Sequence, residues 1–334
     1  MGIAVLGAGV MGTAIALALE RAGNEVSICA TDFDAHIIEA IATTGIHPGM
    51  NQAVPPTVRI VSPERWEEGV TGCDIVVVAV ASAGVGSVVR RASSWLDRAS
   101  VLVVASKGWE PSTGRPLSQV VAGESPNTSV VVVAGPTLAA ELAGGTPTGL
   151  VCASVDRSAA ELVASRIRST SVRAYVTTDV AGVEVGAALK NVLAIAIGMC
   201  DGIAEAKGRP MTNTKAALFS RGLVEMSRMA GAMGGLPETV MGLSGAGDLF
   251  VTVLGGRNGR FGRLVGAGVS PELAFEEMGT TVEGYENTHL AMKLADRLSL
   301  DLPVVRMVHR VLFEGEAPED GVRALVLGEV EQEI

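Results

Sequence analysis

The N-terminal half of the chain contains several short runs in which consecutive residues are apolar. The runs are IAVL, EVSICA, DIVVVAV, SVLVVAS, SVVVVAG and GLVCAS, and helical segments separate them. A strand with one solvated face alternates apolar and polar residues, whereas a strand covered by helices on both faces is apolar throughout. The runs therefore predict an α/β domain built on a doubly wound parallel sheet.

The strand pattern ends after VRAYVTTD, and the rest of the chain predicts helices only. Gly-rich turns such as GGLPETV and LGGRNGR separate these helices, and Pro271 follows Ser270 at a predicted helix start. A chain of 334 residues is long enough for two domains. We predict a Rossmann-like domain at residues 1–178 and an all-helical domain at residues 179–334.

Composition and charge limit which binding partners and which cellular compartment we expect. A formal net charge of −10 repels nucleic acid and anionic membrane surfaces, so we expect neither as a partner. The four Cys and four His residues are scattered without ligand spacing, which predicts a reducing compartment and no metal. The residues after Met1 form an apolar strand pattern without a basic segment, so we expect no secretion signal. Charge-free stretches such as residues 125–140 are shorter than the roughly 20 residues that span a bilayer. We expect a cytoplasmic protein.

A glycine-rich turn lies between the first predicted strand and the first predicted helix. Gly7, Gly9 and Gly12 have the GxGxxG spacing, and Asp32 follows the second strand. Such glycines permit a tight turn, the approach of a pyrophosphate and close helix packing, while the acid binds a ribose hydroxyl. The sequence therefore predicts a dinucleotide site. The segment ATDFD has two acids and no arginine for a 2′-phosphate, which favours NAD over NADP unless an arginine from elsewhere reverses this.

Lys190 lies in the middle of the apolar segment GVEVGAALKNVLAIAIG, and two interpretations of it are open. On a helix, small residues lie one turn away on its face, among them Gly186, Ala187 and Ala194. A snorkelling lysine would lay its methylene groups on apolar surface and keep its ammonium in water. Alternatively, the small residues leave clearance for an anionic or carbonyl-bearing ligand, or for close helix packing.

Other polar residues lie at strand ends and among glycines. Lys107 ends the strand in VVASKGWE, where ligands of open α/β sheets bind. Asp248 lies in GLSGAGDLFVTVLGGRNGRFG, and a lysine is its expected partner because an unpaired buried carboxylate is costly. In the same segment, Arg257 and Asn258 suit an oxyanion, because a guanidinium offers a planar fork to phosphate.

Eight separated motifs resemble those of the NAD(P)-dependent glycerol-3-phosphate dehydrogenases. They are GAGVMGTAIA, SKGWE, AGPTLAAE, GVEVGAALKNVLAIAIG, NTKAALFSRGL, GLSGAGDLFVT, GGRNGRFG and VEGYENT, in the family's order along nearly the whole chain. This family interconverts sn-glycerol 3-phosphate and dihydroxyacetone phosphate. The resemblance therefore implies hydride transfer with NAD or NADP, a small phosphorylated substrate, a place in glycerol-3-phosphate and phospholipid metabolism, and a homodimer.

The resemblance also implies roles for individual residues. Lys190 would be the acid/base group, and Lys107 and Asp248 would share in catalysis. The implied substrate-binding residues are Lys107, Gly135, Thr137, Lys190, Asn191, Asp248, Thr252, Arg257 and Asn258. The implied cofactor-binding residues are Gly7, Gly9, Val10, Met11, Gly12, Asp32, Lys107, Ala139, Arg257, Thr281 and Glu283.

Several positions depart from the family pattern. Gly255 and Gly256 replace a usual Gln-Ser, Gly259 replaces a common second arginine, Met11 replaces an aromatic residue, and MCDGIAEAKGRPMTNTK is a longer connection. Another phosphorylated ketone or polyol therefore stays an alternative substrate. A β-hydroxyacid dehydrogenase is a further alternative, although that family places its asparagine one turn after the lysine, whereas Asn191 follows directly. A non-catalytic dinucleotide sensor is the third.

Overall fold

The computed structural model describes residues 2–96, 101–125 and 128–328. Ser100, which begins one predicted strand, and residues 329–334 of the second predicted domain lie outside the described residues. The chain divides into two compact units, Met1–Val180 and Ala181–Ile334, which we call unit 1 and unit 2.

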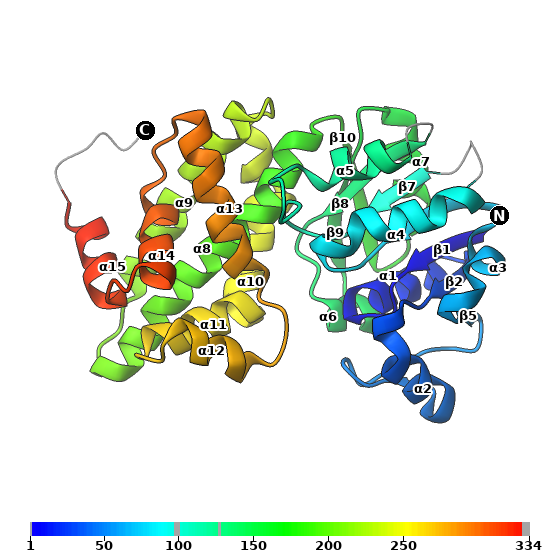
Figure 1. The fold of residues 1–334 in the computed structure, drawn as a ribbon, viewed down its shortest axis with the longest axis horizontal. Coiled ribbons are helices and arrows are strands. Elements are labelled where there is room, and N and C mark those ends of the chain that lie inside the picture. The colour runs from blue at the N-terminus through cyan, green and yellow to red at the C-terminus, as the bar shows by residue number, and fades with distance from the viewer. Residues whose placement is uncertain (1, 97–100, 126–127, 329–334) are drawn as a thin grey trace. The chain divides into compact units, whose positions relative to one another are not determined.

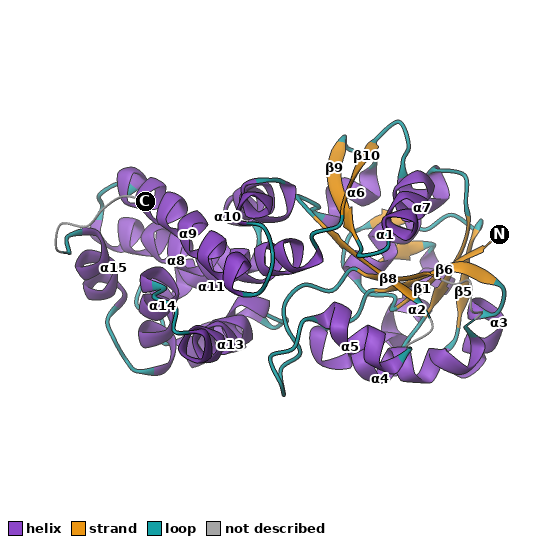
Figure 2. Cartoon of the chain, turned by 90° about the horizontal axis from the view of Figure 1, so that it is seen from above, coloured by secondary structure: helices purple, strands orange, loops and turns teal. Residues whose placement is uncertain are grey.

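Unit 1 contains one large twisted sheet with helices on both faces (Figures 1 and 2). The strand order is β10-β9-β8-β7-β6-β1-β2-β5. The bounds are β1 Gly2–Leu6, β2 Glu25–Cys29, β5 Val58–Val61, β6 Cys73–Val78, β7 Val101–Val104, β8 Ser129–Ala134, β9 Thr148–Ala153 and β10 Val172–Thr177. Strands β3 Ile46–His47 and β4 Gln52–Ala53 form a separate antiparallel pair.

The sheet has the Rossmann arrangement over six strands, because β1 pairs in parallel with both β2 and β6. The strand order thus reverses at β1, which creates a crevice at the carboxyl ends of these strands. The predicted doubly wound parallel sheet is confirmed over these six strands. One edge departs from it, since β8 and β9 are antiparallel and β10 follows the direction of β9. Consecutive apolar residues indicate burial on both faces but carry no information about strand direction.

Helices cover both faces of the sheet in unit 1, as the apolar runs predicted. Ile3 and Val5 pack with Ile15 of α1, whereas Leu6 is buried on the opposite face. Helices α1, α6 and α7 lie on one face, and α3, α4 and α5 lie on the other (Figure 2). The helix bounds are α1 Val10–Arg21, α2 Ala35–Thr44, α3 Trp66–Val70, α4 Val85–Ala92, α5 Leu117–Glu124, α6 Ala139–Gly144 and α7 Arg157–Ile167. The short 3-10 turns are η1 Asp32–Asp34, η2 Pro63–Arg65, η3 Ser82–Gly84 and η4 Ser93–Trp95.

Unit 2 is all-helical over its described residues, as predicted. Ser270 accepts a hydrogen bond from the N–H of Leu273 and caps the helix that begins at Pro271, so this predicted helix start is also confirmed. The bounds are α8 Val180–Lys207, α9 Thr212–Ala232, α10 Asp248–Gly255, α11 Arg257–Gly266, α12 Pro271–Met278, α13 Glu283–Leu298, α14 Pro303–Phe313 and α15 Pro318–Val326. A 3-10 turn, η5 Pro237–Met241, and a π turn, η6 Leu243–Gly247, precede α10.

Helix α8 forms the core of unit 2, and every residue from Gly182 to Cys200 is buried. Its length and composition would allow it to cross a membrane, but 89% of its most apolar window is buried inside the protein. Core packing therefore accounts for its apolar sequence.

Helix α11 approaches α8 so closely that main-chain atoms of the two helices face each other. A Cβ atom on Gly262 would lie 2.2 Å from the carbonyl oxygen of Ile195, and one on Gly266 would lie 2.1 Å from that of Met199. These distances leave no room for any side chain, so both positions require glycine.

A buried carboxylate joins two helices of unit 2. Glu225 of α9 accepts hydrogen bonds from the N–H groups of Val304 at 2.6 Å and Val305 at 3.1 Å, in the first turn of α14. Burial is the main influence on this carboxyl group and raises its pKa from 4.5 to about 7, although both N–H groups and Arg228 lower it. The folded protein thus binds this proton more tightly than the unfolded chain does.

The raised pKa of Glu225 predicts a pH-dependent loss of stability. The contribution of the protonated group is complete below pH 4.5 and is lost as pH rises to about 7. The free energy of unfolding of the wild type relative to Glu225→Gln should therefore fall between pH 5 and 8, by on the order of 3 kcal/mol. Urea unfolding of both proteins across this range measures the difference, and parallel pH profiles would contradict it.

Candidate functional site

The glycine-rich turn after β1 has the geometry of a pyrophosphate cradle. Gly7 has a φ of 108°, and a Cβ atom on Gly12 would lie 2.2 Å from the carbonyl oxygen of Gly7. A Cβ atom on Gly9, in contrast, would meet no atom within 4 Å. Gly9 is also the N-cap of α1, and because glycine has no side chain it cannot cap the first N–H groups of this helix. The open space and the helix N-terminus together fit a dinucleotide phosphate.

Two buried side chains that no sequence motif indicates hold this turn in place. The Asp34 carboxylate accepts hydrogen bonds from the N–H groups of Ala8 at 3.0 Å and Thr31 at 2.7 Å. Gly49 donates its N–H to Nδ1 of His47, so Nε2 carries the proton and donates to the carbonyl oxygen of Ala8 at 3.0 Å. Asp34 is the second acid of ATDFD, and spacing alone does not distinguish it from the first. No pattern in the sequence indicates the role of His47.

Asp32 differs from Asp34 because its side chain is 78% exposed. It is the first residue of η1, in the turn that follows β2, where an acid can reach the ribose hydroxyls of a bound dinucleotide. At the start of α1, Val10 is exposed and Met11 is half-buried. The structure also brings Arg91 of α4 to 3.8 Å from the Asp32 carboxylate, so an arginine absent from ATDFD does reach this acid.

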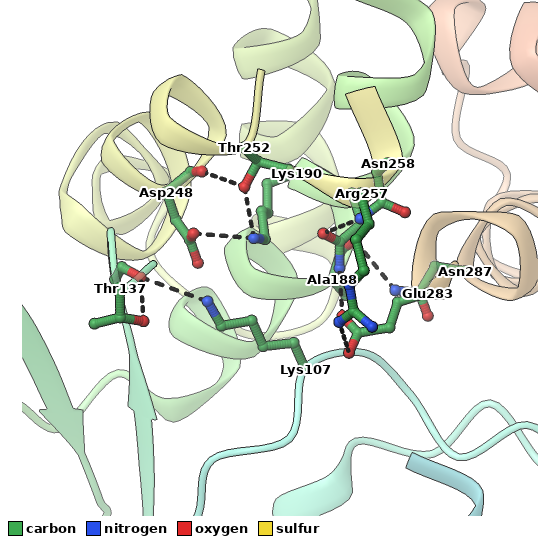
Figure 3. Close-up of polar contacts among 12 residues, drawn as sticks. Lys107, Thr137, Ala188, Lys190, Asp248, Thr252, Arg257, Asn258, Glu283 and Asn287 are labelled. Carbon is green, nitrogen blue, oxygen red and sulfur yellow. Dashed lines mark hydrogen bonds and ion pairs between the residues drawn. The ribbon is translucent and has the colours of Figure 1, made fainter. Parts of the chain in front are cut away.

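The strand-end residues Lys107 and Thr137 meet at one carbonyl group in unit 1 (Figure 3). The Lys107 ammonium lies 3.5 Å from the carbonyl oxygen of Gly135, and the Thr137 hydroxyl donates to the same oxygen at 3.1 Å. Gly135 has a φ of 131°, which favours glycine. Ala139 is the first residue of α6. Lys107 and Thr137 thus lie at the carboxyl ends of β7 and β8, at the edge where the sequence placed them.

In unit 2, Lys190 is buried with only 6% of its surface exposed, which excludes the snorkelling interpretation. Its ammonium donates to the Asp248 carboxylate at 2.9 Å and to the Thr252 hydroxyl at 2.7 Å (Figure 3). The Thr252 hydroxyl in turn donates to the main-chain carbonyl of Asp248 at 2.6 Å, which leaves its oxygen lone pairs for Lys190. The predicted pairing of Asp248 with a lysine is confirmed.

Local structure explains why these three side chains meet. Asp248 begins α10 and Thr252 lies one turn later, so both side chains share a helix face. The carboxylate also lies in the first turn, where the helix dipole favours a negative charge. A Cβ atom on Gly186 would lie 3.0 Å from the carbonyl oxygen of Ser244, just before α10. Gly186 therefore serves close packing, which was one of its two open interpretations.

A chain of amide hydrogen bonds runs from Asn191 to the start of α13. The Asn258 side-chain Oδ1 accepts a hydrogen bond from the N–H of Gly284 at 2.8 Å, and its Nδ2 donates to the side-chain Oδ1 of Asn191 at 2.8 Å. The Asn191 amide group donates to the Glu283 carboxylate at 3.1 Å. Each amide therefore has a fixed orientation, and α8, α11 and α13 are linked beside Lys190.

Arg257 lies at the start of α11 and is about half exposed, with a side-chain exposure of 53%. Its guanidinium lies 3.4 Å from the Thr280 hydroxyl and 4.0 Å from the Glu283 carboxylate. Thr281 is exposed in the segment that precedes α13. The N-cap of α11 is Gly256, where a Cβ atom would lie 2.5 Å from the Thr252 carbonyl oxygen. A serine could not replace Gly256 without a shift of this turn.

No group of three or more His, Cys, Asp or Glu side chains within the described ranges is arranged to hold a metal ion. The four cysteines are buried and take part in no disulfide, and burial raises the pKa of Cys29, Cys152 and Cys200 to about 12. These thiols are therefore protonated core residues rather than reactive groups.

Comparison with known proteins identifies the family. Residues 2–160 match the model of the NAD-dependent glycerol-3-phosphate dehydrogenase N-terminus, and residues 179–323 match that of the C-terminus. The chain belongs to the NAD-dependent glycerol-3-phosphate dehydrogenase family. The resemblance seen in the eight sequence motifs is thus confirmed.

Relatives in the glycerol-3-phosphate dehydrogenase family match this member over nearly its whole length. A glycerol-3-phosphate dehydrogenase [NAD(P)+] of Thermoanaerobacter sp. is 36% identical, covering 100% of this chain and 99% of the relative. The enzyme of Thioalkalivibrio sulfidiphilus is 38% identical, with 97% and 96% covered. The crystal structure of glycerol-3-phosphate dehydrogenase from Coxiella burnetii has a TM-score of 0.90 and 32% identity, covering 98% of this chain and 99% of that one.

Proposed function

We propose that this protein transfers hydride reversibly between NAD(P)H and dihydroxyacetone phosphate to give sn-glycerol 3-phosphate, with Lys190 as the acid/base group. The observation that carries this proposal is the buried lysine whose ammonium is held by Asp248 and Thr252. A ketone that accepts hydride develops negative charge on its oxygen, and a fixed ammonium is suited to stabilise this charge. The names of the full-length relatives support the same reaction.

Lys190 acts on the substrate oxygen in both directions. Bound NAD(P)H supplies the hydride that the carbonyl carbon accepts. Lys190 donates a proton from Nζ to the carbonyl oxygen, which becomes the hydroxyl group of the product. Asp248 and Thr252 hold Nζ in position during this transfer. In the oxidation of the alcohol, neutral Lys190 accepts the hydroxyl proton.

The remaining predicted residues divide into two roles. For the cofactor, the turn at Gly9 takes the pyrophosphate and Asp32 takes the ribose hydroxyls. For the substrate, Arg257 at the uncapped start of α11 binds the phosphate group. Lys107 supplies a further positive charge at the strand ends of unit 1. Asn258, the next residue of α11, is oriented by its hydrogen bonds with Gly284 and Asn191 and binds the substrate beside Arg257.

Replacing Lys190 should slow turnover strongly while cofactor binding is kept. We expect Lys190→Ala to lower kcat by about 10²- to 10⁴-fold, because the proton donor is lost, and to leave the Kd of NADH within about twofold. Steady-state kinetics and fluorescence titration measure the two effects. Lys215→Ala is the matched control, because Lys215 also pairs with an aspartate in the same unit, Asp201 at 2.7 Å. This variant should keep the wild-type kcat. Retained turnover in Lys190→Ala would refute the acid/base role.

The phosphate group should decide substrate choice. We expect kcat/KM for dihydroxyacetone phosphate to exceed that for unphosphorylated dihydroxyacetone by at least about 10³-fold, since only the former offers a phosphate group to the Arg257 guanidinium. A panel of phosphorylated ketones and β-hydroxyacids, run with NADH and with NADPH, makes the measurement. No turnover of dihydroxyacetone phosphate with either cofactor would refute the proposed reaction, and faster turnover of another ketone would reassign the substrate.

We further propose that the protein is a cytoplasmic homodimer, as the family resemblance implies. The chain has a mass of 34.2 kDa. Sedimentation equilibrium should therefore give about twice this mass, and a monomer at micromolar concentration would contradict the proposal.

A further inference from the structure

Two elements of unit 1, η2 and α3, hold the Arg91 side chain beside Asp32. Its guanidinium donates to the carbonyl oxygen of Pro63, and its Cζ lies 4.4 Å from the ring centroid of Trp66. Trp66 is itself fixed, because it is 1% exposed and its indole N–H donates to the carbonyl oxygen of Ala30 at 2.7 Å. The arginine is therefore stacked and oriented before any ligand binds.

The guanidinium is oriented but still accessible to a ligand. Arg91 Nη1 lies 3.8 Å from Oδ2 of Asp32, and the two side chains are 38% and 78% exposed. An exposed ion pair at this distance contributes little to the stability of the fold, so a gain in stability does not explain why Arg91 is held beside Asp32. Glu64 is a further carboxylate nearby, and its pKa is lowered mainly by hydrogen bonds from its own main chain and from the Ser62 side chain, with Arg91 adding a smaller lowering. An anion bound beside Asp32 would thus meet the fixed positive charge of Arg91 alongside the negative charges of Asp32 and Glu64.

The two members of the pair favour different ligands. A carboxylate at the end of β2 accepts hydrogen bonds from both ribose hydroxyls of NAD and repels a phosphate on the 2′ oxygen. A guanidinium within 4 Å of that carboxylate can bind the same phosphate through its planar N–H fork. Their balance therefore decides between the two cofactors.

We propose that Arg91 is a specificity-determining residue that binds the 2′-phosphate of NADP(H) and offsets Asp32, so that this enzyme accepts both cofactors. The inference rests on the proposed function, because it places the adenosine ribose at Asp32. It modifies the preference for NAD indicated by ATDFD, since the arginine that this segment lacks comes from α4.

Binding measurements with purified full-length protein test the proposal without turnover. Arg91→Met keeps an unbranched side chain over Trp66 but removes the charge and the hydrogen bonds. We expect its Kd for NADPH to rise about tenfold or more, while its Kd for NADH stays within about twofold, because only NADPH carries the 2′-phosphate. Arg90→Met is the matched control. Arg90 is adjacent in the same helix and pairs with Glu124 at 2.8 Å, so both affinities should stay unchanged.

A second variant tests the opposing residue and guards against misfolding. Asp32→Asn should tighten NADPH binding and weaken NADH binding several-fold, because it removes the negative charge that repels the 2′-phosphate. A thermal unfolding midpoint near that of the wild type shows that each variant is folded.

The outcomes separate this inference from the proposed function. Equal loss of both cofactors in Arg91→Met, an unchanged Kd for NADPH, or a wild type that binds NADH but not NADPH would overturn the role of Arg91 alone. A wild type that binds neither cofactor would overturn the proposed function as well.

Discussion

Main-chain contact around α8 is the constraint on which the arrangement of unit 2 depends. Gly262 and Gly266 bring α11 against the main chain of α8, and Gly186 allows the same approach to the segment before α10. Because the neighbouring backbones lie so close, water has little access to Lys190. The lysine must find its partners on the surrounding helices, and the first turns of α10 provide them.

The pair of Lys190 and Asp248 is costly to bury. Their side chains are only 7% and 2% exposed, and the desolvation of both charges is repaid only by their mutual attraction and by hydrogen bonds such as that to Thr252. Apolar residues of similar volume would be about as stable at these positions. Stability therefore does not account for the pair, whereas a proton donor protected from water does.

Several features of the fold could be predicted because they depend on neighbours in the chain. Apolar runs predicted most strands of unit 1 and their burial on both faces, and the GxGxxG spacing predicted the turn around Gly9. Strand β5 was missed because its sequence, VRIV, is short and carries Arg59 at the edge of the sheet. The antiparallel direction of β9 was missed because apolar runs look alike in both directions. Nor did spacing distinguish the buried Asp34, which holds the turn, from the exposed Asp32.

The sequence by itself determined the class of each domain, the glycine positions and the kinds of charged group available, because these follow from local periodicity and residue chemistry. Only the tertiary structure decided which of those groups meet. Lys190 and Asp248 are 58 residues apart in the chain, and Arg91 reaches Asp32 from a helix on one face of the sheet. Such pairings depend on how helices and strands pack, since side chains distant in sequence interact only after the backbone has brought them together.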